Sequence, residues 1–205
     1  MQEEKFKKYT YPNLILKIKF KDHKKYKTKL LNLLKKSGEI NFVSQDNYYN
    51  DKLLRTDWLE ASNWRRPWVK LIFKSIYSHL KECAEEMGYQ SIKLHKLWYQ
   101  QYAFGDLHNW HTHDGNYTGT YYLEFDKKSS TTEFLYPNNL KKAFTIEVKE
   151  GDILFFPCHL IHRSATSQSK KTKSIISWNT DFDKVQKQYL HTRKNCKTLK
   201  EKNVI

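Results

Sequence analysis

The stretch WHTHDGNYTGTYYL, residues 110–123, carries His111 and His113 one residue apart, just ahead of an aromatic run. Further along the chain, the stretch GDILFFPCHLIH, residues 151–162, ends in His162. Side chains i and i+2 of a strand point to the same face, so two imidazoles from one strand and a third from a neighbour can bind one metal ion with positions left open. The two stretches predict a β-protein that holds a metal through His111, His113 and His162.

Short strands are expected on both sides of these stretches. Apolar residues alternate with a period of two from Ser91 onward, and short apolar or aromatic runs separated by turn residues follow. These runs cover residues 118–125, 132–136, 144–148, 152–156 and 173–180. Many short strands at this spacing predict a mainly β fold with N-terminal helices, a double-stranded β-helix of the jelly-roll or cupin-like kind.

The chain is expected to form one domain with three parts. Residues 1–90 are predicted to be a helical part packed on the barrel, because apolar residues recur at helical spacing over residues 22–36 and again over residues 69–87. Residues 91–182 are predicted to be the β-helix core that holds the site. Residues 183–205 are predicted to form a basic C-terminal tail.

Basic residues dominate the charge of the chain. The net charge is +15, and most of it comes from lysine. The arginines are Arg55, Arg65, Arg66, Arg163 and Arg193. Such a charge is compatible with nucleic acid, but base readout and bidentate phosphate binding use arginine, which is scarce here. Nucleic acid is therefore a possible partner but not the favoured one.

Cysteine usage and hydropathy indicate the compartment. Cys83, Cys158 and Cys196 are widely spaced and form neither a disulfide framework nor a thiolate metal motif. The sequence holds no apolar run long enough for a membrane helix, and its first residues lack an apolar signal segment. We expect a cytoplasmic protein without a membrane partner. Antiparallel sheet edges make a homodimer possible.

Three segments in order resemble one family. Residues 110–123 are similar to the metal-binding strand of Fe(II)- and 2-oxoglutarate-dependent oxygenases, and more closely to a phage and marine-bacterial branch with an H-x-H, then S/T-G-V/T-x-Y signature. EGDILFFP at 150–157, with His162, resembles the GD-x-x-x-FP…H segment of that branch, and KSIISWN at 173–179 resembles its R-x-S-I-S-F-N strand. The resemblance covers residues 91–182. It implies Fe(II) as the metal and 2-oxoglutarate as the cosubstrate.

The implied ligand set departs from the wider superfamily at one position. His113 stands where the usual triad of two histidines and one carboxylate has Asp or Glu. Asp114 is adjacent, but on a regular strand it would point to the opposite face unless a bulge reverses it. An alternative frame, HDG at 113–115, resembles the H-x-G of iron halogenases, where a missing carboxylate opens a halide position. His111, His113 and His162 are the favoured ligands, with Asp114 in reserve.

The resemblance also implies a cation for the distal carboxylate of 2-oxoglutarate. In the family an arginine on the strand after the last histidine provides it, and the aligned residue here is Lys173, which otherwise reads as a solvated surface lysine. Alternation along a strand puts Ser177 and Asn179 on the same face as Lys173. Tyr122 and Tyr102 are further candidate contacts of the cosubstrate.

The function that the resemblance implies is a 2-oxoglutarate/Fe(II)-dependent dioxygenase. It would hydroxylate an unidentified prime substrate with O₂ and release succinate and CO₂. Two alternatives stay open: a three-histidine cupin dioxygenase that does not use 2-oxoglutarate, and a non-enzymatic basic β-barrel binding module. The resemblance further implies a viral or marine-bacterial source and, for a virus, the host cytoplasm.

Overall fold

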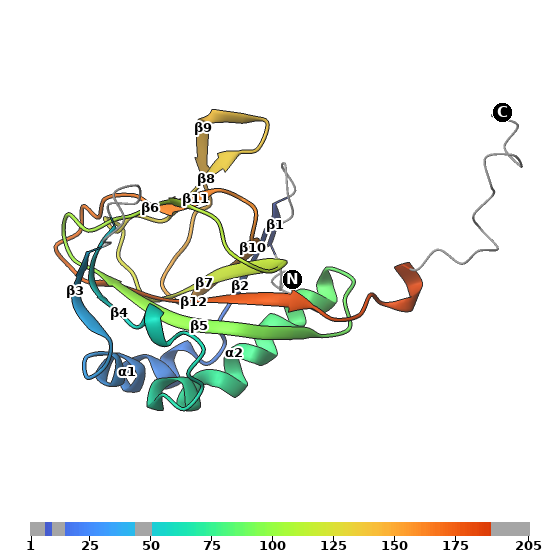
Figure 1. Cartoon of the computed structure of the whole chain (residues 1–205), viewed down its shortest axis with the longest axis horizontal. Coiled ribbons are helices and arrows are strands. Elements are labelled where there is room, and N and C mark those ends of the chain that lie inside the picture. Colours follow the sequence, from blue (N-terminus) through green and yellow to red (C-terminus); the bar gives the residue numbers. More distant parts are fainter. Residues whose placement is uncertain (1–6, 10–14, 44–50, 190–205) are drawn as a thin grey trace, which may run out of the picture.

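Two antiparallel sheets form the body of the protein (Figure 1). The computed structural model describes residues 7–9, 15–43 and 51–189. In spatial order, the larger sheet contains β1 (Lys7–Tyr9), β2 (Ile15–Lys19), β10 (Asp152–Pro157), β7 (Tyr117–Glu124), β12 (Lys173–Phe182), β5 (Ile92–Tyr102), β4 (Lys52–Thr56) and β3 (Glu39–Val43). The smaller sheet contains β6 (His108–His111), β11 (His162–Ser164), β8 (Thr132–Tyr136) and β9 (Asn139–Thr145). This arrangement confirms the mainly β, jelly-roll prediction.

Two helices cover the outer face of the larger sheet: α1 (His23–Leu34) and α2 (Pro67–Glu86) (Figure 1). Both occupy the segments where helical spacing predicted them. Ile72, Ile76 and Leu80 of α2 are fully buried, as their three- and four-residue spacing requires for one face of a helix. Gly88, with φ at 90°, follows the end of α2 in the left-handed conformation that glycine adopts most readily. Short 3₁₀ turns lie at η1 (Trp58–Glu60) and η2 (Lys187–Tyr189).

Alternation along the central strands separates two cores. From β12, Ile176 and Trp178 face the helices, whereas Ile175 belongs to a second cluster between the sheets. On the inner side of the same sheet, polar residues replace many of the apolar ones. Those that are buried there include Gln100, Thr118, Thr120, Lys173, Ser177 and Asn179. A buried sheet face with this many polar groups is expected where a site is formed, because isolated polar groups are costly in a core.

Four of the five predicted runs agree with strands of the structure, and the third run differs. The run at 144–148 was expected as a strand, but β9 occupies Asn139–Thr145. The turn after β8 is short enough for β9 to pair back at once, with Phe134 opposite Phe144. The exposed residues of β9 carry no alternating apolar signal, while Ile146 and Val148 are buried outside any strand.

The segment 1–90 contributes more than helices. Besides α1 and α2 it supplies β1 to β4, which extend both edges of the larger sheet. The helical expectation omitted these strands because lysines interrupt their apolar residues, as in ILKIK of β2. In the expected tail, η2 ends at Tyr189, and residues 190–205 lie outside the described part of the chain. Within the described part, no helix combines the length and apolar character that crossing a bilayer requires.

Candidate metal centre and adjoining cavity

Three histidines meet between the two sheets. His111, at the end of β6, lies directly opposite His162 of β11 in the register of the smaller sheet. With His113 they offer one ligand atom each, and these atoms all lie within 4.8 Å of one another. Ring centroids are 4.3 Å apart for His111 and His162 and 5.0 Å for His113 and His162. The three residues therefore form one cluster that a single metal ion can contact.

The two histidines of the H-x-H motif do not share a strand. β6 ends at His111, so His113 lies in the following loop, where its backbone N–H donates to the carbonyl oxygen of Cys158 at 3.0 Å. The expectation that strand alternation aligns them was wrong in this detail. The side chain of Asp114 is 90% exposed and pairs with Lys96 at 3.4 Å, so it lies outside the cluster.

Backbone carbonyls orient two of the imidazoles. Nδ1 of His111 lies 2.6 Å from the carbonyl oxygen of Asn109, and Nδ1 of His162 lies 2.8 Å from that of Leu160. A carbonyl only accepts, so each Nδ1 carries the proton and each Nε2 keeps a free lone pair. Burial lowers the pKa of His111 to about 4.

Burial likewise lowers the pKa values of His113 and His162 well below the usual range. Neutral imidazole is the form that binds a metal. Three neutral nitrogen donors fit Fe(II).

Lys173 lies behind the lining of a narrow pocket beside this cluster, because its ammonium contacts Ser164, one of the residues that line the pocket. Its side chain is almost fully buried, at 1% exposure. The ammonium donates to the hydroxyl of Ser164, which is two residues from His162 on β11, and to the carbonyl oxygen of Ser130 at 3.0 Å. It also lies 3.9 Å from the centroid of the Tyr102 ring. In the described part of the chain, no carboxylate pairs with it, and burial lowers the pKa of Lys173 to about 7.

The other residues that were expected to contact the cosubstrate are Tyr122, Tyr102, Ser177 and Asn179, and they do not all lie in one place. The Tyr122 hydroxyl contacts Thr132 Oγ1 at 2.7 Å, so Thr132 lies between it and the pocket. The Tyr102 hydroxyl donates to Oε1 of Gln100 at 3.2 Å. Ser177 lines the narrow pocket between the histidines and Ser164, whereas Asn179 lines the larger cavity on the outer side.

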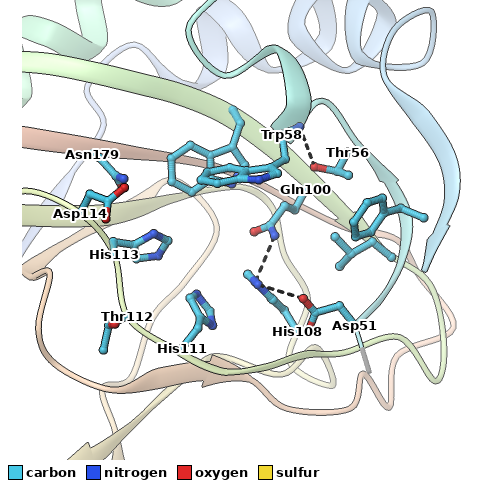
Figure 2. Close-up of a pocket in the computed structure, with 13 residues that line it drawn as sticks. Asp51, Thr56, Trp58, Gln100, His108, His111, Thr112, His113, Asp114 and Asn179 are labelled. Carbon is cyan, nitrogen blue, oxygen red and sulfur yellow. Dashed lines mark hydrogen bonds and ion pairs between the residues drawn. The ribbon is translucent and has the colours of Figure 1, made fainter. Parts of the chain in front are cut away.

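A cavity of about 310 Å³ opens beside His111 and His113 (Figure 2). Its other lining residues are Phe42, Asp51, Leu53, Thr56, Trp58, Trp98, Gln100, His108, Thr112, Asp114 and Asn179. Asp51, Gln100 and His108 were not among the candidate site residues predicted from the sequence. The ring of His108 stacks on His111 with centroids 3.9 Å apart. No local pattern indicated this contact in advance, because residues three apart on a regular strand point to opposite faces.

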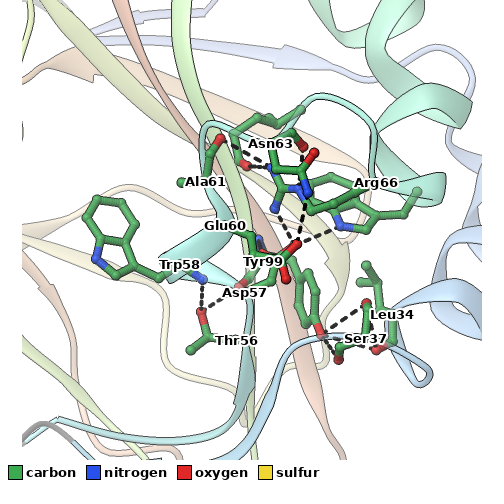
Figure 3. A network of polar contacts seen from close by, with 12 residues as sticks. Leu34, Ser37, Thr56, Asp57, Trp58, Glu60, Ala61, Asn63, Arg66 and Tyr99 are labelled. Carbon is green, nitrogen blue, oxygen red and sulfur yellow. Dashed lines mark hydrogen bonds and ion pairs between the residues drawn. The ribbon is translucent and has the colours of Figure 1, made fainter.

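A buried network of ion pairs and hydrogen bonds lies beside the segment that carries Trp58, one of the cavity's lining residues (Figure 3). The Asp57 carboxylate accepts hydrogen bonds from Arg66, from the Trp68 indole at 2.8 Å and from the Tyr99 backbone N–H at 2.9 Å. Asp57 directly precedes Trp58, which lines the cavity. Arg66 and Trp68 therefore have a structural role, whereas Trp58 faces the cavity.

No protein-family model and no curated protein matches the sequence. Solved structures do match. The viral collagen prolyl hydroxylase of Paramecium bursaria Chlorella virus-1, in complex with 2-oxoglutarate, aligns over 81% of this chain and 94% of its own, with a TM-score of 0.57 and 17% identity. The chain has the fold of the Fe(II)- and 2-oxoglutarate-dependent oxygenases.

Two further structures with this fold differ in chemistry. A Trichoplax adhaerens prolyl hydroxylase, in complex with a hypoxia-inducible-factor peptide fragment, aligns over 80% of this chain and 82% of its own (TM-score 0.56, 18% identity). SnoK, an α-ketoglutarate-dependent carbocyclase from nogalamycin biosynthesis, aligns over 82% and 79% (TM-score 0.59, 10% identity). The oxygenase fold and the three-histidine cluster are together consistent with Fe(II) and 2-oxoglutarate as cofactors.

Proposed function

We propose that this protein is an Fe(II)- and 2-oxoglutarate-dependent dioxygenase that hydroxylates its prime substrate. His111, His113 and His162 are the proposed metal ligands, and Lys173 is the proposed partner of the distal carboxylate of 2-oxoglutarate. The fold and the mutual proximity of the three histidines support the metal assignment. When bound, the iron supplies the activation of O₂, which couples decarboxylation of the cosubstrate to oxidation of a C–H bond.

The overall reaction balances as R–H + 2-oxoglutarate + O₂ → R–OH + succinate + CO₂. One oxygen atom enters the substrate and the other enters succinate. Two electrons come from the C–H bond and two from the oxidative decarboxylation. The protein's own groups orient the reactants: the carbonyls of Asn109 and Leu160 hold two imidazoles with Nε2 free, and the larger cavity adjoins His111 and His113.

The observation that carries the proposal is the buried, unpaired lysine. Lys173 is 1% exposed, and the neighbours of its ammonium among the described residues are hydroxyl, carbonyl and aromatic groups. Such burial is costly, and a ligand carboxylate would offset that cost. Ser164 links Lys173 to the strand that carries His162. A dicarboxylic acid with one end on the metal and the other at Lys173 would satisfy both groups.

Anaerobic spectroscopy tests the proposal. Adding Fe(II) and 2-oxoglutarate should produce a weak visible charge-transfer band, and admitting air should produce succinate even without a prime substrate. His113→Ala should abolish the band, and Asp114→Ala should retain it. Absence of the band together with absence of succinate would contradict the proposal. Loss of the band in Asp114→Ala alone would transfer the ligand role to Asp114.

A three-histidine dioxygenase that does not use 2-oxoglutarate is the second candidate, favoured by the lack of a carboxylate in the cluster. Lys173→Met separates the two candidates. Under the main proposal this variant binds the metal but loses the 2-oxoglutarate-dependent band. Under the second candidate, O₂ consumption by the wild-type protein is independent of 2-oxoglutarate and survives the substitution.

A further inference from the structure

The cavity beside the histidines has both apolar and acidic lining residues. Its apolar lining residues are Phe42, Leu53, Trp58 and Trp98, and the Trp58 and Trp98 rings meet edge to face with centroids 4.6 Å apart. Asp51 lies across the cavity from Trp58 (Figure 2). A volume of about 310 Å³ suits a small molecule or one long side chain. The walls therefore favour a ligand with an apolar stem and a polar end.

Asp51 is a buried carboxylate without a cationic partner among the described residues. The residue is 9% exposed. One carboxylate oxygen accepts the backbone N–H of Asn109 at 2.8 Å, and the other lies 3.4 Å from Nε2 of His108. Burial raises the pKa of Asp51. A carboxylate in this position gains from a cation that reaches it through the cavity.

Hydrogen bonds assign a neutral form to His108. The Tyr102 hydroxyl donates to Oε1 of Gln100, which turns Nε2 of that amide toward His108. The amide then donates to Nδ1 of His108 at 3.1 Å. A ring whose Nδ1 accepts a hydrogen bond carries its proton on Nε2 and has no net charge. His108 can thus donate toward Asp51 but cannot neutralise its charge.

The charge of the cavity is opposite to that of the chain. Lysine and arginine make up 37 of the 205 residues, yet the described residues that line the cavity include two carboxylates, Asp51 and Asp114, and no lysine or arginine. Outside the lining, the ammonium of Lys96 lies 3.4 Å from Asp114 and 5.1 Å from the centroid of the Trp58 ring. The ammonium of Lys96 thus already contacts a carboxylate and an aromatic ring, which are the two kinds of group that the cavity would present to a cationic ligand.

We propose that this cavity binds a cationic alkyl side chain, an ammonium or guanidinium group on a flexible apolar stem as in lysine or arginine, with the charged end at Asp51 and the stem against Trp58 and Leu53. The proposal that this ligand is the prime substrate rests on the proposed function. A carbon of the stem would then lie near His111 and His113, where its C–H bond becomes C–OH by the reaction given above. An anionic ligand would meet the Asp51 carboxylate, and a nucleic acid would find no lysine or arginine among the described lining residues.

Metal-free binding measurements test this proposal separately from the oxygenase reaction. The probe is Nα-acetyl-lysine amide, its uncharged match is Nα-acetyl-norleucine amide, and the readouts are tryptophan fluorescence and titration calorimetry. The lysine probe should bind at least about tenfold more tightly than the norleucine probe. Asp51→Asn should remove that preference, while Asp183→Asn, an exposed carboxylate outside the cavity, should keep it.

Two further measurements identify the kind of molecule that carries the cation and provide a second variant in case Asp51→Asn misfolds. If free lysine binds as well as the blocked probe, the ligand is an amino acid, and if only the blocked probe binds, it is a residue of a peptide. If Asp51→Asn fails to fold, Trp58→Leu provides a second variant at a partly exposed position, and it should weaken binding of the lysine probe. Equal binding of the two probes, an unchanged preference in Asp51→Asn, or binding of a single-stranded oligonucleotide but of neither probe would overturn the proposal. A charge-transfer band with 2-oxoglutarate would still support the proposed function in each of these cases.

Discussion

Arg66 and Lys173 are both buried cations, but their surroundings differ. Arg66 is 5% exposed and pairs with Asp57, and it also donates to the carbonyl oxygens of Asn63, Ala61 and Leu97. Lys173 is 1% exposed and has only neutral partners among the described residues. A buried charge with a full set of partners belongs to the architecture. A buried charge that lacks a counterion is better explained by a ligand that brings one.

Removing the counterion of Arg66 should give the largest effect on stability. Asp57→Asn leaves the guanidinium buried without its charge partner, and this should lower the free energy of unfolding by about 3–5 kcal/mol. Urea denaturation followed by circular dichroism measures the change. Glu85→Gln, in an exposed pair with Lys81, should cost about 0–1 kcal/mol. A loss below about 1 kcal/mol in Asp57→Asn would show that the network is not structural.

Replacing Lys173 should affect the binding of 2-oxoglutarate and not reduce the stability of the fold. Lys173→Met removes an unpaired buried charge but keeps most of the side-chain volume, so stability should stay the same or rise. Affinity for 2-oxoglutarate should fall by about 2–5 kcal/mol, or at least about thirtyfold, in the metal-loaded protein. Titration calorimetry near pH 6.5 measures this loss. Destabilisation as large as that of Asp57→Asn, with unchanged 2-oxoglutarate affinity, would refute the ligand role.

The pH dependence of 2-oxoglutarate binding should follow Lys173. Its pKa of about 7 means that most of the protein must take up a proton at pH 8 before the ammonium can pair with a carboxylate. The dissociation constant at pH 8 should therefore be roughly tenfold larger than at pH 6. Tyr102 and Tyr122 stay neutral over this range because burial raises their pKa values. A flat profile would show that the lysine is already fully charged or does not contact the ligand.

The same pKa determines how the ligand-free protein responds to pH. The folded protein releases the Lys173 proton near pH 7, whereas the unfolded chain holds it until about pH 10.4. Between these values the unfolded state binds more protons, so the contribution of this lysine to stability increases as pH rises. Comparison of the wild type with Lys173→Met by urea denaturation at several pH values isolates the contribution, which the variant should lack.

Replacing Ser164 should have the smallest effect on the affinity for 2-oxoglutarate. Ser164→Ala removes one neutral acceptor of the Lys173 ammonium, and the expected cost in 2-oxoglutarate affinity is about 0.5–1.5 kcal/mol. Calorimetry under the same conditions as for Lys173→Met measures it. Ser75→Ala, which alters a distant contact with Asp22, serves as the matched control. A larger effect for Ser164→Ala than for Lys173→Met would mean that the serine, and not the lysine, dominates binding.

The sequence predicted the elements whose burial follows a simple pattern. The run DILFFP of β10 is buried on both faces and reads as a strand from its continuous apolar residues. The exposed residues of β9 and the lysines that interrupt β2 carry no comparable signal. For this reason β9 was predicted at the wrong residues and β2 was not predicted. The histidine cluster was predictable because three residues of one metal-binding type stand in recognisable motifs.

Other parts of the site depend on contacts that no local pattern encodes. Lys173 follows two lysines in the sequence and reads equally well as a solvated residue. Its burial results from packing against Tyr102 on β5, which is distant in the sequence, and against Ser164 on β11, which is nine residues away but in the other sheet. Asp51 likewise acquires its place only when β6 lies beside the start of β4, where the backbone N–H of Asn109 donates to its carboxylate. Such groups become visible only once the sheets are assembled.

One titration tests the central claim that Lys173 is held for the distal carboxylate of 2-oxoglutarate. Calorimetry of the Mn(II)-loaded protein with 2-oxoglutarate at pH 8, in two buffers of different ionisation enthalpy, gives the number of protons taken up on binding. The account predicts an uptake close to one proton in the wild type and none in Lys173→Met, whose binding is also much weaker. Tight binding without proton uptake, unchanged by the substitution, would contradict it.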